Sequence, residues 1–133
     1  MLHHGATGGA SGPLEEGKTV IWQFGDFPGE APVSVKKEIP SELIVFEWAA
    51  AESKDEDLLA NKMHKAKDYN TRVEIKFESL DPESTLVKIS ESRWKEDQSG
   101  LESSYGNCMG WSQMISCLKA YVEYGINLRR GFY

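Results

Sequence analysis

The sequence has few cysteines, few histidines and no long apolar segment. Its two cysteines, Cys108 and Cys117, are too few for the disulfide scaffold of a small secreted domain. They lie in a segment with helical periodicity, which separates them by about 13 Å along the helix axis. A disulfide needs Cα atoms within about 7 Å, so these two cannot pair within the chain. We expect both to be buried small hydrophobic residues.

Membrane spans, a signal peptide and an excess of positive charge are also missing. No apolar run approaches the roughly 18 residues needed to cross a bilayer. Residues 1–17 are rich in glycine where a signal peptide needs an apolar segment. Acidic residues outnumber basic ones by 21 to 15, whereas non-specific nucleic-acid binding needs a positive surface. We therefore expect a cytoplasmic protein that binds neither nucleic acid nor a membrane.

Two sequence patterns that often mark a metal site or a nucleotide site lack the neighbouring residues or elements that such a site requires. The three histidines are His3, His4 and His64, and no second Cys/His spacing accompanies them. Residues 12–19 match the phosphate-binding expression GxxxxGK(S/T), but such a loop must follow a buried strand and open a helix. Here the alternating residues from Thr19 onward indicate a strand. We expect no metal, no bound nucleotide and no cofactor.

The sequence does contain the material for a folded core and a strong alternation of apolar and polar residues. Hydrophobic residues make up 40% of 133 residues, which suits one domain. Residues 1–17 are expected to be a lead or loop, 18–133 the domain itself, and the charged segment 51–68 a solvated loop. Alternation predicts strands at 18–24, 33–39, 42–48, 71–78 and 85–94, with turns at 25–29 and 81–82. In the segment 71–78 one face carries Thr71, Val73, Ile75 and Phe77, and the other carries the charged residues Arg72, Glu74, Lys76 and Glu78. The segment 42–48, ELIVFEW, is apolar on both faces over part of its length, as in a strand covered on both sides.

The C-terminal segment predicts one long helix. Asn107 is a suitable N-cap, and residues 108 to about 128 repeat with helical period, with Gly125 as a late interruption. Several antiparallel strands covered by one helix make an α+β fold. The apolar stripe of this helix consists of Trp111, Met114, Ile115, Leu118, Tyr121 and Val122.

Glu91 is the residue whose position in the pattern points to chemistry. In the strand 85–94 it continues a row that includes the apolar Val87 and Ile89. A carboxylate on the inner face of a sheet must be paired, neutralised or functional. Three interpretations stay open. Glu91 forms a salt bridge with Arg72 or Arg93 or turns outward at a bulge, it anchors a ligand inside a cavity, or it is a general base.

Four segments of the chain carry a resemblance to a known family. The closing run GNCMGWSQMISCLKAYVEYGINLRRGFY, with TRVEIKFESL, TLVKISESRW and ELIVFEW, resembles the SRPBCC group of the START/birch-pollen-allergen superfamily. Within it, the similarity is to the branch related to the activator of the heat-shock protein 90 ATPase. The resemblance implies a helix-grip fold, in which a curved antiparallel sheet wraps around the C-terminal helix and encloses an apolar pocket. We expect the ligand-binding residues to be Trp22, Phe24, Phe46, Trp48, Val73, Ile75, Phe77, Ile89, Glu91, Trp94, Trp111, Met114, Ile115 and Leu118.

The start of the chain departs from this family. Its members open with a strand and two short helices ahead of the strand that matches residues 18–24, where this chain has the loop 1–17. An uncovered sheet edge and helix face are prone to association. We therefore expect a homodimer or a segment-exchanged assembly.

The resemblance implies binding of a small apolar ligand, lipid-like or aromatic, with Glu91 as the polar contact that orients it. An enzyme of the cyclase or aromatase type is the alternative. Glu91 would then act as general acid or base, assisted by Arg93 or Tyr105. A co-chaperone role rests on the family name alone, because nothing in this chain matches the N-terminal domain with which the true activators engage the chaperone.

Overall fold

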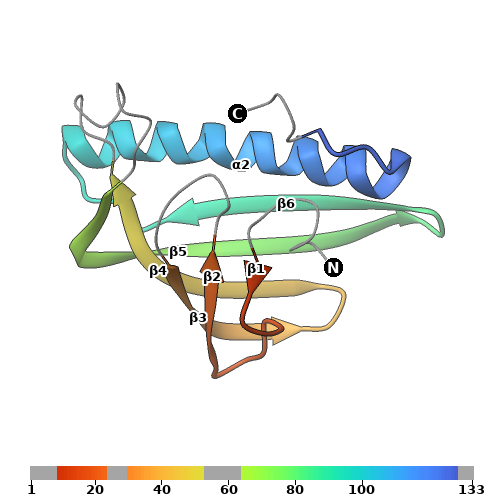
Figure 1. The fold of residues 1–133 in the computed structure, drawn as a ribbon, viewed down its shortest axis with the longest axis horizontal. Helices are drawn as coiled ribbons and strands as arrows, with labels where there is room; N and C mark the ends of the chain where they lie inside the picture. The colour runs from red at the N-terminus through yellow and green to blue at the C-terminus, as the bar shows by residue number, and fades with distance from the viewer. Residues whose placement is uncertain (1–8, 24–29, 53–63, 129–133) are drawn as a thin grey trace.

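The computed structural model describes residues 9–23, 30–52 and 64–128, which form one antiparallel sheet packed on a long helix (Figure 1). The sheet has six strands, which neighbour one another in chain order: β1 (Gly9–Ala10), β2 (Thr19–Gln23), β3 (Glu30–Ile39), β4 (Leu43–Glu52), β5 (His64–Asp81) and β6 (Ser84–Ser92). The helix α2 (Gln98–Tyr124) runs lengthwise along the curved sheet and contacts β4 and β6. The predicted α+β helix-grip arrangement is confirmed.

The core lies on the inner face of the sheet, where apolar side chains meet across neighbouring strands. Val35 pairs with Phe46, Phe46 with Val73, and Val73 with Glu91. The first three are at most 1% exposed, so the row passes from a dry apolar core directly to a carboxylate. Residues directly opposite in an antiparallel pair have Cβ atoms about 5 Å apart, which is why this row is packed continuously.

The strand β5 shows the predicted two-sided pattern. Thr71 and Val73 are fully buried on the inner face, whereas Arg72 and Glu74 between and beside them are partly exposed on the outer face. The strand β4 is covered on both faces at its centre, because the adjacent residues Val45 and Phe46 are both buried. Both features were predicted from the alternation and are confirmed.

The predicted loop at 51–68 is shorter than expected. The strand β4 continues to Glu52 and β5 begins at His64, with Ala51 and Glu52 paired to Lys65 and His64. Residues 53–63 lie outside the described part of the chain. The charged residues of this segment favour contact with solvent. The strands β4 and β5 nevertheless stay paired into the charged segment, with one register shift between Ala49 and Ala51.

Part of the expected lead is docked on the sheet. Gly9 and Ala10 form β1 on the edge of β2, and Ile21 donates its backbone N–H to Ser11 Oγ at 2.9 Å. Leu14 packs against the core, and the Gly17 N–H reaches the Val35 carbonyl at 2.9 Å. Glycine-rich sequence has no apolar period, so these contacts could not be predicted from alternation.

The helix begins ten residues earlier than predicted, at Gln98 and not at residue 108. Asp97, in extended conformation, is the N-cap, and its Oδ1 accepts the Gly100 N–H at 2.7 Å. Asn107, the predicted cap, lies inside the helix and donates to the Ser103 carbonyl at 2.9 Å. A Cβ on Gly100 would lie 2.0 Å from the Lys95 carbonyl oxygen, so this glycine permits close approach of the chain that enters the helix.

The helix ends at Tyr124, earlier than the predicted end near residue 128, and its apolar stripe is covered over only part of its length. Gly125 has the left-handed conformation, with φ of 67°, and caps the helix C-terminus. Cys117 is buried as predicted, whereas the prediction for Cys108 is wrong, because that thiol is exposed. Tyr121 and Val122 continue the stripe but are 42% and 70% exposed. Within the described residues, no helix is both long and apolar enough to cross a membrane.

Candidate functional site

The carboxylate of Glu91 is held by three hydrogen bonds that come from two other strands and the helix. Trp48 Nε1 on β4 donates to Oε2 at 3.0 Å, and Thr71 Oγ1 on β5 donates to the same oxygen at 2.5 Å. Trp111 Nε1 on α2 donates to Oε1 at 2.8 Å. We call these four residues the Glu91 site. Glu91 and both indoles are only partly buried, whereas Thr71 is completely buried.

The strand register explains why these side chains converge. Trp48 pairs with Thr71 across β4 and β5, and Glu91 pairs with Val73, two residues further along β5. Trp48, Thr71, Val73 and Glu91 therefore share the inner face of the sheet. Thr71 lies diagonal to Glu91 on this face. The helix adds Trp111 from above this face, so one carboxylate joins α2 to the sheet.

An aromatic cluster of Trp22, Phe46, Trp48 and Trp111 surrounds one side of the site. Trp22, Phe46 and Trp48 meet edge to face, with ring centroids 5.3 to 5.9 Å apart. Trp48 and Trp111 are stacked at 5.7 Å with an interplanar angle of 26°. Such arrangements suit the aromatic quadrupole, and they fix the direction of the two indole N–H groups that reach Glu91.

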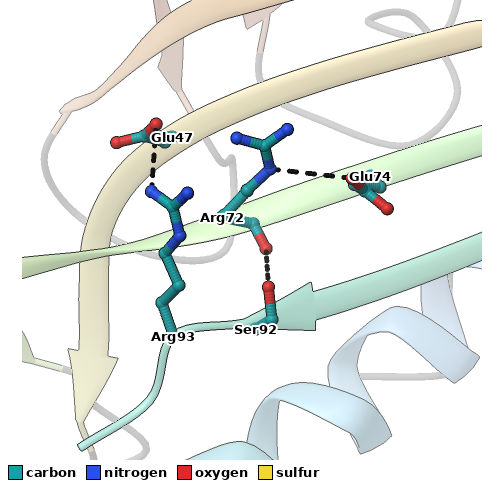
Figure 2. Close-up of polar contacts among 5 residues, drawn as sticks. All are labelled: Glu47, Arg72, Glu74, Ser92 and Arg93. Carbon is teal, nitrogen blue, oxygen red and sulfur yellow. Dashed lines mark hydrogen bonds and ion pairs between the residues drawn. The ribbon is translucent and has the colours of Figure 1, made fainter.

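The salt bridge of Glu91 with Arg72 or Arg93, one of the interpretations that the sequence left open, is not formed among the described residues. Figure 2 shows Arg72 Nε beside Glu74 Oε1 at 3.6 Å and Arg93 Nη1 beside Glu47 Oε2 at 3.5 Å. Glu47 alternates with Phe46 and Trp48 along β4 and so lies on the outer face.

Arg93 leaves the Glu91 row because its backbone has φ of 69°, which ends the strand alternation after Ser92. The Ser92 hydroxyl donates to the Arg72 carbonyl at 3.5 Å, next to the same outer-face pairs (Figure 2). The other assistant considered for acid–base chemistry, Tyr105, is 66% exposed on α2. The structure therefore brings neither Arg93 nor Tyr105 to Glu91.

The Glu91 carboxylate keeps an unused position for a hydrogen-bond donor. A carboxylate has about four acceptor positions on its two oxygens. From the described residues, Oε2 accepts two hydrogen bonds and Oε1 accepts one. Because Glu91 is only partly buried, a donor from a bound molecule can reach the remaining position on Oε1.

The predicted ligand-binding residues differ in how deeply the structure buries them. Phe46 and Val73 are fully buried core, and Phe24 lies outside the described residues. The partly buried residues packed against the core cluster include Trp22, Trp48, Ile75, Ile89 and Trp111. Phe77 on β5 and Met114, Ile115 and Leu118 on α2 are also partly buried.

Trp94 does not lie at the Glu91 site. The strand β6 ends at Ser92, and Trp94 lines an open hollow where the chain enters α2, together with Lys95, Asp97 and Leu101. None of the four residues of the Glu91 site lines this hollow. Alternation continued to residue 94 in the prediction, and the positive φ at Arg93 is what breaks it.

Thr71 is the member of the site that sequence analysis did not select. It belongs to the inner row with Val73, which was predicted, but a threonine at a strand position is usually read as a β-former only. The pattern held one indication: Thr71 and Glu91 are polar residues on the inner faces of two strands expected to be neighbours, and buried polar groups need partners.

The described residues match neither the requirements of a metal site nor those of a phosphate-binding loop. No group of three or more histidine, cysteine, aspartate or glutamate side chains there is placed to hold a metal ion. The phosphate-loop expression at 12–19 leads into β2 and not into a helix, and Lys18 pairs with Glu15.

Comparisons with known proteins address the fold. No family model and no curated protein matches the chain. The crystal structure of protein SSP2350 from Staphylococcus saprophyticus is similar with a TM-score of 0.68 and 24% identity, covering 95% of this chain and 78% of that one. Protein MLL2253 from Mesorhizobium loti is similar with a TM-score of 0.63 and 18% identity, covering 86% and 74%. At these identities the similarity supports the fold alone.

Proposed function

We propose that this protein binds a small apolar ligand between the sheet and α2, at the exposed side of the aromatic cluster, with Glu91 as the polar contact that orients it. The observation that carries the proposal is the Glu91 carboxylate, held on the inner face by Trp48, Thr71 and Trp111. A site of this kind combines mostly apolar surface with a few placed polar groups. The proposal agrees with what the resemblance to the SRPBCC group implies.

The arrangement favours binding over structure alone for two reasons. Among the described residues, none donates to the remaining acceptor position on Glu91 Oε1, so a ligand can supply that donor. The indoles of Trp22, Trp48 and Trp111 are partly buried and not completely enclosed, so apolar surface adjoins that position. Covering such surface with a ligand is favourable at about 25 cal/mol per Å².

The test uses N-phenyl-1-naphthylamine, an uncharged apolar dye whose fluorescence rises in dry surroundings. We expect saturable binding to the wild-type protein, a rise in Tm with dye concentration, and loss of both responses in Trp111→Ala. Trp94→Ala is the matched control, because it removes an indole away from the Glu91 site and should leave dye binding unchanged. Circular dichroism establishes that each variant is folded.

Native mass spectrometry of the freshly purified protein adds a second measurement that needs no chosen dye. A co-purified small molecule that is lost in Trp111→Ala would support the proposal. Dye binding that is equal in wild type and in folded Trp111→Ala would refute binding at this site.

A further inference from the structure

We infer that the ligand of the Glu91 site is an organic cation: an apolar molecule that ends in an ammonium group. This inference rests on the proposed function and adds the charge and the hydrogen-bonding character of the ligand. It follows from the neutral donors around Glu91, from the lack of a positive partner among the described residues, and from the acceptor position on Oε1 to which no described residue donates.

The charge of Glu91 has no positive partner among the described residues. Its three donors are two indole N–H groups and one hydroxyl, all of them uncharged. The nearest candidates along the chain, Arg72 and Arg93, pair with Glu74 and Glu47 on the outer face (Figure 2). A partly buried carboxylate that lacks a counter-charge is costly to desolvate further, so a neutral or anionic ligand that covers it is disfavoured. A ligand that brings a positive charge removes that cost.

The aromatic cluster supplies the apolar part of the site. Trp48 and Trp111 turn their N–H edges toward the carboxylate and stack on each other. Trp22 lies within the same packed cluster. The partly buried apolar surface of these indoles suits the hydrocarbon part of the ligand, so the cationic group is assigned to Glu91 alone.

The acceptor position on Oε1 specifies a group that can donate a hydrogen bond. A primary ammonium supplies charge and donor together, and its hydrogen bond to a carboxylate is charge-assisted. A quaternary ammonium supplies charge without the donor, and an alcohol supplies the donor without charge. These three chemistries can therefore be separated by experiment.

The experiment measures displacement of N-phenyl-1-naphthylamine by four molecules with the same ten-carbon chain, below their micelle concentrations. We expect decylammonium to displace the dye at about ten- to thirtyfold lower concentration than decanol. Decyltrimethylammonium should fall between the two, and decanoate should be weakest. This order is measured on the wild-type protein and needs no variant to fold.

Two variants test whether Glu91 causes the preference for decylammonium over decanol. Glu91→Gln keeps the shape of the side chain but removes its charge, and we expect the ratio of decylammonium to decanol affinity to fall to about one to three. Glu47→Gln is the matched control: it removes a carboxylate from the outer face, and the preference for decylammonium should persist. This control also excludes general attraction of cations to a chain of net charge −6.

The outcomes separate the two proposals. Dye binding that depends on Trp111 but is displaced equally by decanol and decylammonium overturns the inference and leaves the proposed function in place. Strongest displacement by decanoate also overturns the inference. Dye binding that does not depend on Trp111 overturns the proposed function itself.

Discussion

Replacing Glu91 by glutamine creates a defined conflict at the junction of sheet and helix. Glutamine has one acceptor oxygen and one NH₂ group where glutamate has two acceptor oxygens. If the amide oxygen takes the Oε2 position, the NH₂ group faces the Trp111 N–H; in the opposite orientation it faces the Trp48 N–H. Either way, one indole donor loses its acceptor.

The size of the effect follows from the bonds that change. A hydrogen bond to a charged group contributes about 1.5–3 kcal/mol, and leaving a partly buried donor unsatisfied costs about 1–3 kcal/mol. Because Glu91 is only partly buried, we expect Glu91→Gln to lower the free energy of unfolding by about 2–3 kcal/mol. For a chain of this length the corresponding fall in Tm is roughly 6–12 °C.

A double-mutant cycle distinguishes this mechanism from a general loss of stability. Trp111→Phe removes the indole N–H, so in the Glu91→Gln background the glutamine can turn its oxygen toward Trp48 and Thr71 without conflict. We expect the double variant to be more stable than the sum of the single effects by about 1.5 kcal/mol. Urea unfolding followed by far-ultraviolet circular dichroism measures this, since Trp111→Phe alters the fluorescence.

The control for the cycle is Glu47→Gln, which breaks the pair with Arg93 on the outer face. The Arg93 side chain is 57% exposed, so we expect a change within about 1 kcal/mol. A coupling energy between Glu91 and Trp111 below about 0.5 kcal/mol would refute the reasoning, because that is the range of independent sites.

Three further predictions concern the helix. Gly100→Ala should lower the free energy of unfolding by about 1–3 kcal/mol, because the added Cβ meets a backbone carbonyl. Gly106→Ala has nothing within 4 Å of the added Cβ and should raise the Tm, because alanine is the better helix former. Equal effects of the two substitutions in thermal unfolding would contradict this. Burial raises the pKa of the Cys117 thiol, so at pH 8 an alkylating reagent should modify the exposed Cys108 first, as read by peptide mass spectrometry; faster labelling of Cys117 would count against the described packing. The exposed apolar end of the helix stripe leads us to expect self-association that Val122→Lys weakens; a light-scattering mass of a single 14.9 kDa chain for the wild type at micromolar concentration would exclude it.

The parts of the fold that depend on local pattern could be predicted from sequence. The alternation around Val73 placed this residue and Thr71 on one face and their neighbours on the other, because the side-chain period of a strand is two. The same reasoning placed Glu91 on the inner face with Val87 and Ile89, where the structure has it opposite Val73. Gly125, noted in the sequence as a late interruption of the helix, has the left-handed conformation and ends it, which is an equally local effect.

The parts that depend on tertiary contact could not be predicted. The segment QSGLESSYGN has two glycines and three serines, which are weak helix formers, yet it is helical from Gln98. Asp97 caps this segment, and Gly100 leaves room for the Lys95 carbonyl where the chain enters the helix; neither contact follows from periodicity. Arg93 likewise gives no sequence indication of its positive φ, since arginine is uncommon in that conformation.

That single backbone conformation accounts for the character of the Glu91 site. Had the strand continued regularly, Arg93 would share the inner face with Glu91 and could neutralise it. With φ of 69° its guanidinium instead reaches Glu47 on the outer face, and Glu91 is left with indole and hydroxyl donors. The carboxylate then joins α2 to the sheet through Trp111, while no described residue donates to its remaining acceptor position. The cationic ligand that we propose would complete the charge balance that a regular strand would have supplied from within the chain, so we expect stability and ligand recognition to depend on the same carboxylate.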